Sequence, residues 1–333
     1  MWQQYSYNSP AGSRSYSVYT PLNYQVGVAV PLVVMLHGCT QTAADFATGT
    51  QMNQVAEEHN FIVVYPEQTR AYNKLVCWNW FNPSHQFRGS GEPAIIAGIV
   101  QSMQQNTAQW TIDARRIYVA GLSAGAAMAV ILGVTYADLF AAIGVHTGFE
   151  YQAAMAAKSY LKTSRRGGPD PVQQGQAAYA VMGIYARVVP TIVFHGTGDY
   201  TVNLVNGEQV VRQWIQTNML ASHDSYIANF NSPSSSTLDQ VPGGRSYSVC
   251  TWNDSHGKRI QEYWKVNKMG HAWSGGHSQA SYTDPQGPNA SLAIYKFFLQ
   301  HPMSREKGQV APFLKNLLRN FRDLFKPKQE SNK

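Results

Sequence analysis

The fold is decided by residues 116–128, which read Arg116-Ile117-Tyr118-Val119-Ala120-Gly121-Leu122-Ser123-Ala124-Gly125-Ala126-Ala127-Met128. The β-branched and aromatic run that opens this stretch predicts a buried strand, and the alanine-rich run that closes it predicts a buried helix. Gly121 and Gly125 lack a Cβ and therefore suit a crowded turn between the two. Strand, Gly-x-Ser-x-Gly turn and helix together are typical of a nucleophilic serine. We predict that Ser123 is that nucleophile; a plain Gly/Ser-rich turn is the alternative.

The rest of the chain alternates strands with helices. Apolar runs predict buried strands at 32–36, 61–66, 140–145 and 191–194. Later strands are expected at 246–250 and 259–266, and an edge strand at 14–20. Helices are expected at 43–60, 92–103, 207–220 and 290–299, a helical cap at 148–188, and a surface loop at 232–242. This order predicts an α/β fold with a mostly parallel sheet and helices on both faces.

Composition narrows the class of protein. The chain has 333 residues, 44% of them hydrophobic, which is enough for one large α/β domain or two small ones. Of the net charge of +7, five charges fall in 307–333, so the remainder is nearly neutral and we expect no nucleic-acid partner. No signal peptide and no membrane-spanning apolar run is visible. We therefore expect a cytoplasmic protein if the sequence is full length, and a secreted one if a leader was removed.

Three residues that follow predicted strands can form a catalytic set. A serine nucleophile needs a nearby base, which a third group orients. His271, in a glycine-rich loop, is the preferred base; His277 is the alternative, and we interpret His195 as structural. Asp199 is the preferred orienting acid, although it could instead only close an Asx turn. The order Ser123, Asp199, His271 is that of the α/β-hydrolases.

The tetrahedral intermediate formed by such a serine also needs two donors for its oxyanion. The backbone N–H of Ala124, at the start of the predicted helix, is the first donor. The second is expected in the loop after the early strand, and we nominate the backbone N–H of Cys39. A simple strand-exit turn at 37–40 is the alternative.

Six motifs carry a family resemblance: Val33-Val34-Met35-Leu36-His37-Gly38-Cys39-Thr40-Gln41, Tyr65-Pro66-Glu67-Gln68, Cys77-Trp78-Asn79-Trp80-Phe81, Gly121-Leu122-Ser123-Ala124-Gly125, His195-Gly196-x-x-Asp199-x-x-Val202 and Gly270-His271-Ala272-Trp273-Ser274-Gly275-Gly276. Together they resemble the polyhydroxybutyrate (PHB) depolymerase family of esterases, kin of feruloyl and acetylxylan esterases, over roughly residues 10–300. The resemblance implies carboxylic-ester hydrolysis without metal or cofactor. It also implies a Cys39–Cys77 disulfide; two reduced, buried thiols are the alternative.

The substrate is less defined. We expect hydroxyalkanoate oligomers, polyester or short-chain esters, with feruloyl or acetylxylan ester hydrolysis as the alternative. Polymer depolymerases of this type usually carry a linker and a separate polymer-binding domain, whereas this sequence ends in a short basic tail. This difference favours short-chain or oligomeric esters over solid polymer. Trp80 and Trp273 are candidates for the substrate pocket, and each could equally be core. A non-catalytic surface-binding protein of the same fold, and an acyltransferase with the same triad, are the other hypotheses.

The last residues form a distinct segment. We expect a catalytic domain over 1–303 and a basic amphipathic helix and tail over 304–333. The apolar stripe comprises Val310, Phe313, Leu314, Leu317, Leu318, Phe321, Leu324 and Phe325. Lys315, Arg319, Arg322 and Lys326 occupy the other face. Such a helix can dock on its own domain, contact a membrane or polymer surface, or bind a partner.

Overall fold

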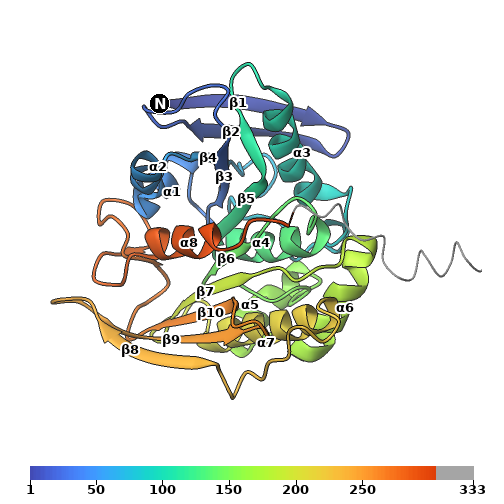
Figure 1. Ribbon diagram of the computed structural model, residues 1–333, viewed down its shortest axis with the longest axis vertical. Coiled ribbons are helices and arrows are strands. Elements are labelled where there is room, and N and C mark those ends of the chain that lie inside the picture. The colour runs from blue at the N-terminus through green and yellow to red at the C-terminus, as the bar shows by residue number, and fades with distance from the viewer. Residues whose placement is uncertain (305–333) are drawn as a thin grey trace, which may run out of the picture.

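A ten-stranded sheet crosses the whole protein in the computed structural model, which describes residues 1–304 (Figure 1). Its order is β1 (Trp2–Ser9), β2 (Gly12–Tyr19), β4 (Ile62–Pro66), β3 (Val30–Leu36), β5 (Ile112–Leu122), β6 (Ile143–His146), β7 (Thr191–Gly196), β10 (Arg259–Val266), β9 (Ser246–Asn253) and β8 (Ser235–Gln240). From β4 to β10 the strands are parallel, whereas β1, β2, β9 and β8 pair antiparallel at the two margins.

Helices cover both faces of this sheet, as the sequence predicts. One layer contains α3 (Gly91–Gln105), α4 (Ala124–Thr135), α6 (Pro171–Met182) and α7 (Leu204–Ala221). The other contains α1 (Ala43–Thr50), α2 (Met52–His59) and α8 (Ala290–Leu299), and α8 lies in front of the strands in Figure 1. The prediction of a mostly parallel sheet between two helical layers is confirmed.

The central strand β3 shows why the apolar runs are continuous. Leu32, Val34 and Leu36 belong to the core beneath the α3–α4–α7 layer. Val33 and Met35 belong to the core on the opposite face. All five side chains are fully buried, and successive residues of a strand point to opposite faces. Because β3 is covered on both faces, an unpaired polar side chain within it would be costly. Each of these apolar side chains contributes roughly 1.5–3 kcal/mol by burial.

The margins of the sheet differ from the prediction. Segment 14–20 lies within β2, which is flanked by β1 and β4 and is therefore not an edge strand. The expected loop at 232–242 contains β8, whose six residues are all exposed. Both β1 and β8 are edge strands that pair with one neighbour. No residue of either is fully buried, although Tyr5 and Tyr7 of β1 pack against the core.

Two helical segments also depart from the expected bounds. The expected helix 43–60 is interrupted at Gln51, whose left-handed φ of 56° separates α1 from α2. In the predicted cap, α5 (Tyr160–Arg166) contacts the residues after β7, because the Asn203 N–H donates to the Ser164 carbonyl. The second helix of this segment, α6, packs along α7.

The C-terminal prediction falls almost entirely outside the described residues. Of segment 304–333, the structure describes only Ser304. The proposed boundary at residue 303 and the basic amphipathic helix therefore stay predictions. Within residues 1–304, no helix combines the length and the apolar character needed to cross a bilayer.

Candidate active site

Ser123 lies on a strained turn between β5 and α4. Its φ of 56° and ψ of −118° are unusual for a residue with a side chain. A Cβ on Gly121 would lie 2.5 Å from the carbonyl oxygen of Gly125. A Cβ on Gly125 would lie 2.6 Å from the His37 carbonyl oxygen, and closer still to that of Leu36. Both glycines are therefore required by the close approach of strand and helix.

Asp199 and His271 are joined directly. Asp199 follows β7, and its Oδ2 accepts a hydrogen bond of 2.8 Å from Nδ1 of His271. Its Oδ1 accepts the backbone N–H groups of Thr201 and Val202, at 2.9 and 2.8 Å. Asp199 thus closes an Asx turn and holds the histidine at the same time. Since Nδ1 of His271 donates to this carboxylate, Nε2 keeps a free lone pair for a proton.

The two other histidines considered as bases lie differently. His195 is fully buried and its Nε2 donates to the Val202 carbonyl at 2.9 Å. Burial lowers the pKa of His195, so this ring is neutral. His277 binds Gly49 through its backbone and accepts the Gln279 N–H at Nδ1. These contacts make His271 the better candidate.

The serine and the histidine are not yet in hydrogen-bond contact. Within residues 1–304, no hydrogen bond joins the Ser123 hydroxyl to His271. Such bonds are often long in the absence of substrate and shorten in the complex. The roles of Ser123, Asp199 and His271 therefore belong to the proposal below.

The loop after β3 packs against the serine. A Cβ built on Gly38 would lie 3.6 Å from the Ser123 Cβ, so the two backbones are close neighbours. Ala124 is the first residue of α4, where a helix leaves its N–H groups without an internal partner. This N–H therefore lies directly beside Ser123, and its role as an oxyanion donor stays a prediction.

Cys39 has a free backbone donor in the same loop. The N–H of Gly38 donates to Oε1 of Gln41 at 2.9 Å, and that of Thr40 donates to the Leu75 carbonyl at 2.9 Å. The intervening N–H of Cys39 has no protein partner in the described part of the chain. This donor is consequently free to bind another acceptor, and its role in an oxyanion hole stays a prediction.

His37 fixes the shape of this loop. Its Nε2 accepts the Gln68 N–H at 3.0 Å, so its Nδ1 carries the proton and donates to the Gly38 carbonyl at 2.7 Å. Burial lowers the pKa of His37 to about 4, which keeps the ring neutral. Because the Gly38 carbonyl is held by this ring, the Gly38–Cys39 peptide has a defined orientation.

Cys39 and Cys77 form a disulfide in the structure. It attaches the long irregular segment 67–90 to the loop that follows β3. Trp78 and Trp80 of that segment are buried in the core next to this attachment. The disulfide therefore holds an aromatic segment against the proposed oxyanion loop.

The two candidate pocket tryptophans are both buried. Trp273 is 1% exposed, stacks on His146 and donates its indole N–H to Ser291. It therefore packs under the residues that follow His271, and its place in a substrate pocket stays a prediction. Trp80 is 2% exposed and stacks on Phe149 at a centroid distance of 4.4 Å. Its place in a substrate pocket stays a prediction.

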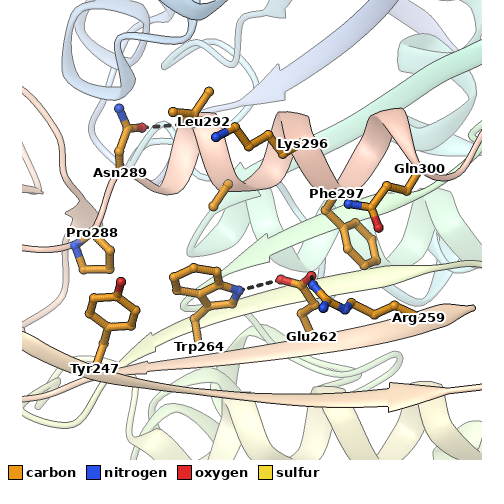
Figure 2. A pocket seen from close by; sticks show the side chains of 11 residues that line it. Tyr247, Arg259, Glu262, Trp264, Pro288, Asn289, Leu292, Lys296, Phe297 and Gln300 are labelled. Carbon is orange, nitrogen blue, oxygen red and sulfur yellow. Dashed lines mark hydrogen bonds and ion pairs between the residues drawn. The ribbon is translucent and has the colours of Figure 1, made fainter. Parts of the chain in front are cut away.

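A groove separate from the residues described above lies between α8 and strands β9 and β10 (Figure 2). Figure 2 shows Trp264 and Tyr247 on its strand side and Lys296 on its helix side. Glu262 accepts the Trp264 indole N–H at 2.7 Å, which fixes the ring. None of the proposed catalytic residues lines this groove.

One residue of the site was not predicted. His146 ends β6 and is fully buried between the serine turn and the His271 loop. It follows a predicted strand, so the same strand-end rule that selected Ser123 could have selected it. Within residues 1–304, no three His, Cys, Asp or Glu side chains are grouped as metal ligands.

Several known proteins are similar to this chain. A poly(3-hydroxyalkanoate) depolymerase C from Paucimonas lemoignei is 35% identical over 72% of this chain and 54% of its own length. A poly(3-hydroxybutyrate) depolymerase from Ralstonia pickettii is 27% identical over 83% and 55%. The chain thus spans about half the length of these two relatives. An acetylxylan esterase A from Emericella nidulans is 32% identical over 59% of this chain and 65% of its own length.

The fold is also found among solved structures. An acetyl xylan esterase from Aspergillus awamori superposes with a TM-score of 0.70 at 20% identity, covering 90% of this chain and 99% of the other. The predicted α/β-hydrolase fold is confirmed by this likeness. The family model of the esterase PHB depolymerases matches residues 14–226. The chain therefore belongs to the PHB depolymerase family of esterases.

Proposed function

We propose that this protein is a serine carboxylic-ester hydrolase that works through an acyl-enzyme. Family membership supports this reaction class. The observation that carries the proposal is the 2.8 Å bond between His271 and Asp199, at the sheet edge where Ser123 adopts a φ of 56°. A base oriented by a buried carboxylate, beside a serine on a strained turn, is the arrangement that acyl transfer requires.

In the first half of the reaction, the Ser123 hydroxyl oxygen attacks the ester carbonyl carbon and Nε2 of His271 takes the hydroxyl proton. Asp199 holds the imidazole in the tautomer that leaves Nε2 free and stabilises the imidazolium that forms. The backbone N–H groups of Cys39 and Ala124 donate to the oxyanion. His271 then returns its proton to the departing alcohol, and the acyl group remains on Ser123.

In the second half, a water molecule gives a proton to His271 and attacks the acyl carbon. The oxyanion occupies the same two donors, and collapse releases the carboxylic acid while Ser123 recovers its proton from His271. Loss of one oxyanion donor costs on the order of 10²–10³ in rate in comparable sites.

For the substrate, we propose oligomers of hydroxyalkanoic acids or short-chain esters. The supporting observation is the 35% identity to a poly(3-hydroxyalkanoate) depolymerase. The second candidate is an acetylxylan or feruloyl ester, which is favoured by the 32% identity to an acetylxylan esterase and the 29% identity to a feruloyl esterase B.

A rate panel separates these candidates. Wild type and Ser123→Ala should be compared on 3-hydroxybutyrate oligomers, acetylated xylan, methyl ferulate and p-nitrophenyl butyrate. We expect turnover by wild type, greatest kcat/KM on the oligomers, and near-complete loss in the variant. Full activity of Ser123→Ala would refute the mechanism. A preference for acetylated xylan or methyl ferulate would select the second candidate, and no turnover of any ester would support the non-catalytic surface-binding hypothesis.

We also propose that the protein acts in an oxidising compartment outside the cytoplasm. The Cys39–Cys77 disulfide supports this, because such bonds are rare in reducing cytosol. Contact of segment 304–333 with a membrane or polymer surface stays a prediction. Deleting 305–333 and comparing binding to anionic vesicles and to polymer granules would test it.

A further inference from the structure

We propose that His146 is a positioning residue that couples the nucleophile turn to the loop carrying the catalytic base. This inference rests on the proposed ester hydrolysis. His146 does not reach the substrate in this account. It acts through two hydrogen bonds. Its carbonyl oxygen binds the backbone N–H of the serine turn, and its imidazole binds a backbone N–H of the His271 loop.

The first bond comes from the main chain. The carbonyl oxygen of His146 accepts the backbone N–H of Ser123 at 3.0 Å. Leu122 and His146 are register partners in the parallel pair β5–β6, so this bond continues the ladder by one step beyond the strand. The strained conformation of Ser123 is therefore anchored directly on His146.

The second bond comes from the imidazole. Nε2 of His146 accepts the backbone N–H of Ser274 at 3.0 Å, across a sequence separation of 128 residues. Trp273 and Ser274 form the short strand β11, which begins two residues after His271. The side chain of His146 thus binds the segment that carries the proposed base, while the main-chain carbonyl of the same residue binds Ser123.

The ring is fixed in the tautomer that this bond needs. Since Nε2 accepts a hydrogen bond, Nδ1 carries the proton and donates to Oγ1 of Thr147 at 3.1 Å. Burial, with smaller contributions from His195 and His271, lowers the pKa of His146 well below its ordinary value. The ring is consequently neutral, and its acceptor is available.

Packing immobilises the imidazole as well. It stacks on Trp273 at a centroid distance of 4.8 Å and on Phe194 of β7 at 5.5 Å. Both neighbours are fully buried. A ring held on two faces and at both nitrogens has one position, so the spacing between the serine turn and the His271 loop is set by this residue.

Two amide variants test the coupling without changing the polarity of the site. The Oε1 atom of glutamine can replace Nε2 as the acceptor for Ser274, whereas asparagine is one methylene shorter and cannot reach it. We expect His146→Gln to keep kcat within about threefold of wild type. We expect His146→Asn to lose on the order of 10- to 100-fold in kcat with little change in KM, because displacing a catalytic group by about 1 Å has an effect of that order.

His301→Gln is the matched control. His301 is also fully buried and binds two backbone carbonyls, those of Phe297 and Arg259, but it contacts no proposed catalytic segment. The His301→Gln substitution should lower the urea midpoint and leave kcat unchanged. Steady-state kcat and KM on p-nitrophenyl butyrate, with urea unfolding of each variant, provide the comparison.

The outcomes separate this inference from the proposed function. If wild type turns over esters and His146→Asn keeps full kcat, or if both amide variants lose kcat equally, the positioning role is wrong while ester hydrolysis stands. If wild type hydrolyses no ester, the proposed function itself fails. Loss of kcat in His146→Asn with rescue in His146→Gln supports the coupling.

Discussion

Substitution of Gly125 by alanine tests whether the serine turn depends on backbone contact. The new Cβ would lie 2.6 Å from the His37 carbonyl oxygen, whereas ordinary contact begins at 3.4 Å. The His37 contact alone would require strand β3 and helix α4 to separate by about 0.8 Å, and the closer Leu36 carbonyl oxygen requires more. The obstacle is backbone, which no rotamer change can move. This separation occurs between the proposed oxyanion loop and Ser123, the proposed nucleophile.

The expected loss has two parts. Overpacking of a well-packed core costs about 1–3 kcal/mol in unfolding free energy. A displacement of about 1 Å between catalytic groups lowers kcat by on the order of 100-fold. Gly125→Ala should therefore fold with reduced stability and retain little activity, chiefly through kcat.

Gly133→Ala in the same helix is the control. Its Cβ would lie 3.1 Å from side-chain atoms of Ile143 and Trp214, which can shift by a few tenths of an ångström. Urea unfolding and p-nitrophenyl butyrate kinetics should show a nearly unchanged kcat for this variant. If Gly125→Ala folds and keeps kcat within threefold of wild type, our explanation of the two glycines is wrong.

Three further predictions concern the Asp199 carboxylate, the buried Glu150 and the disulfide. Asp199→Asn should lower kcat on the order of 10⁴-fold in ester kinetics, because an amide favours the wrong tautomer of His271; unchanged kcat would exclude the orienting role. Burial raises the pKa of Glu150 from 4.5 to about 9, so the folded state keeps a proton that the unfolded chain loses between these values, and stability falls as pH rises through this window. Urea midpoints should therefore show an advantage of Glu150→Gln that grows from pH 5 to pH 8.5, and a constant difference would contradict the buried, protonated state. Paired replacement of Cys39 and Cys77 by serine should cost about 4 kcal/mol for the closed loop of 38 residues, measured by urea unfolding, and no loss of stability would show that the disulfide is not formed.

The interior of the fold could be predicted because its physical constraints are local. The Gly121–Gly125 turn allows few other residues, and a strand such as β3 that is buried on both faces must be continuously apolar. Because chemistry in such sheets lies beyond the carboxyl ends of the strands, the sequence then predicts that Ser123, Asp199 and the His271 loop share one edge of the sheet.

The remaining features depend on contacts that a local pattern does not contain. All six residues of β8 are exposed, and β1 packs only the half-buried Tyr5 and Tyr7 against the core, so neither strand has a continuous apolar run. The break between α1 and α2 has its left-handed residue at Gln51, so no glycine marks it in the sequence. The bond from Ser274 to His146 joins residues 128 positions apart, and the sequence around either residue does not predict it.

Covalent labelling tests the central claim most directly. Wild type and His271→Ala should be treated with a fluorophosphonate probe, digested, and mapped by mass spectrometry. We predict one adduct on Ser123 in wild type and at least a 100-fold slower reaction in His271→Ala, because the serine is then without its base. An adduct on another residue, or ester turnover by wild type with Ser123 unlabelled, would contradict the assignment of Ser123 as the nucleophile.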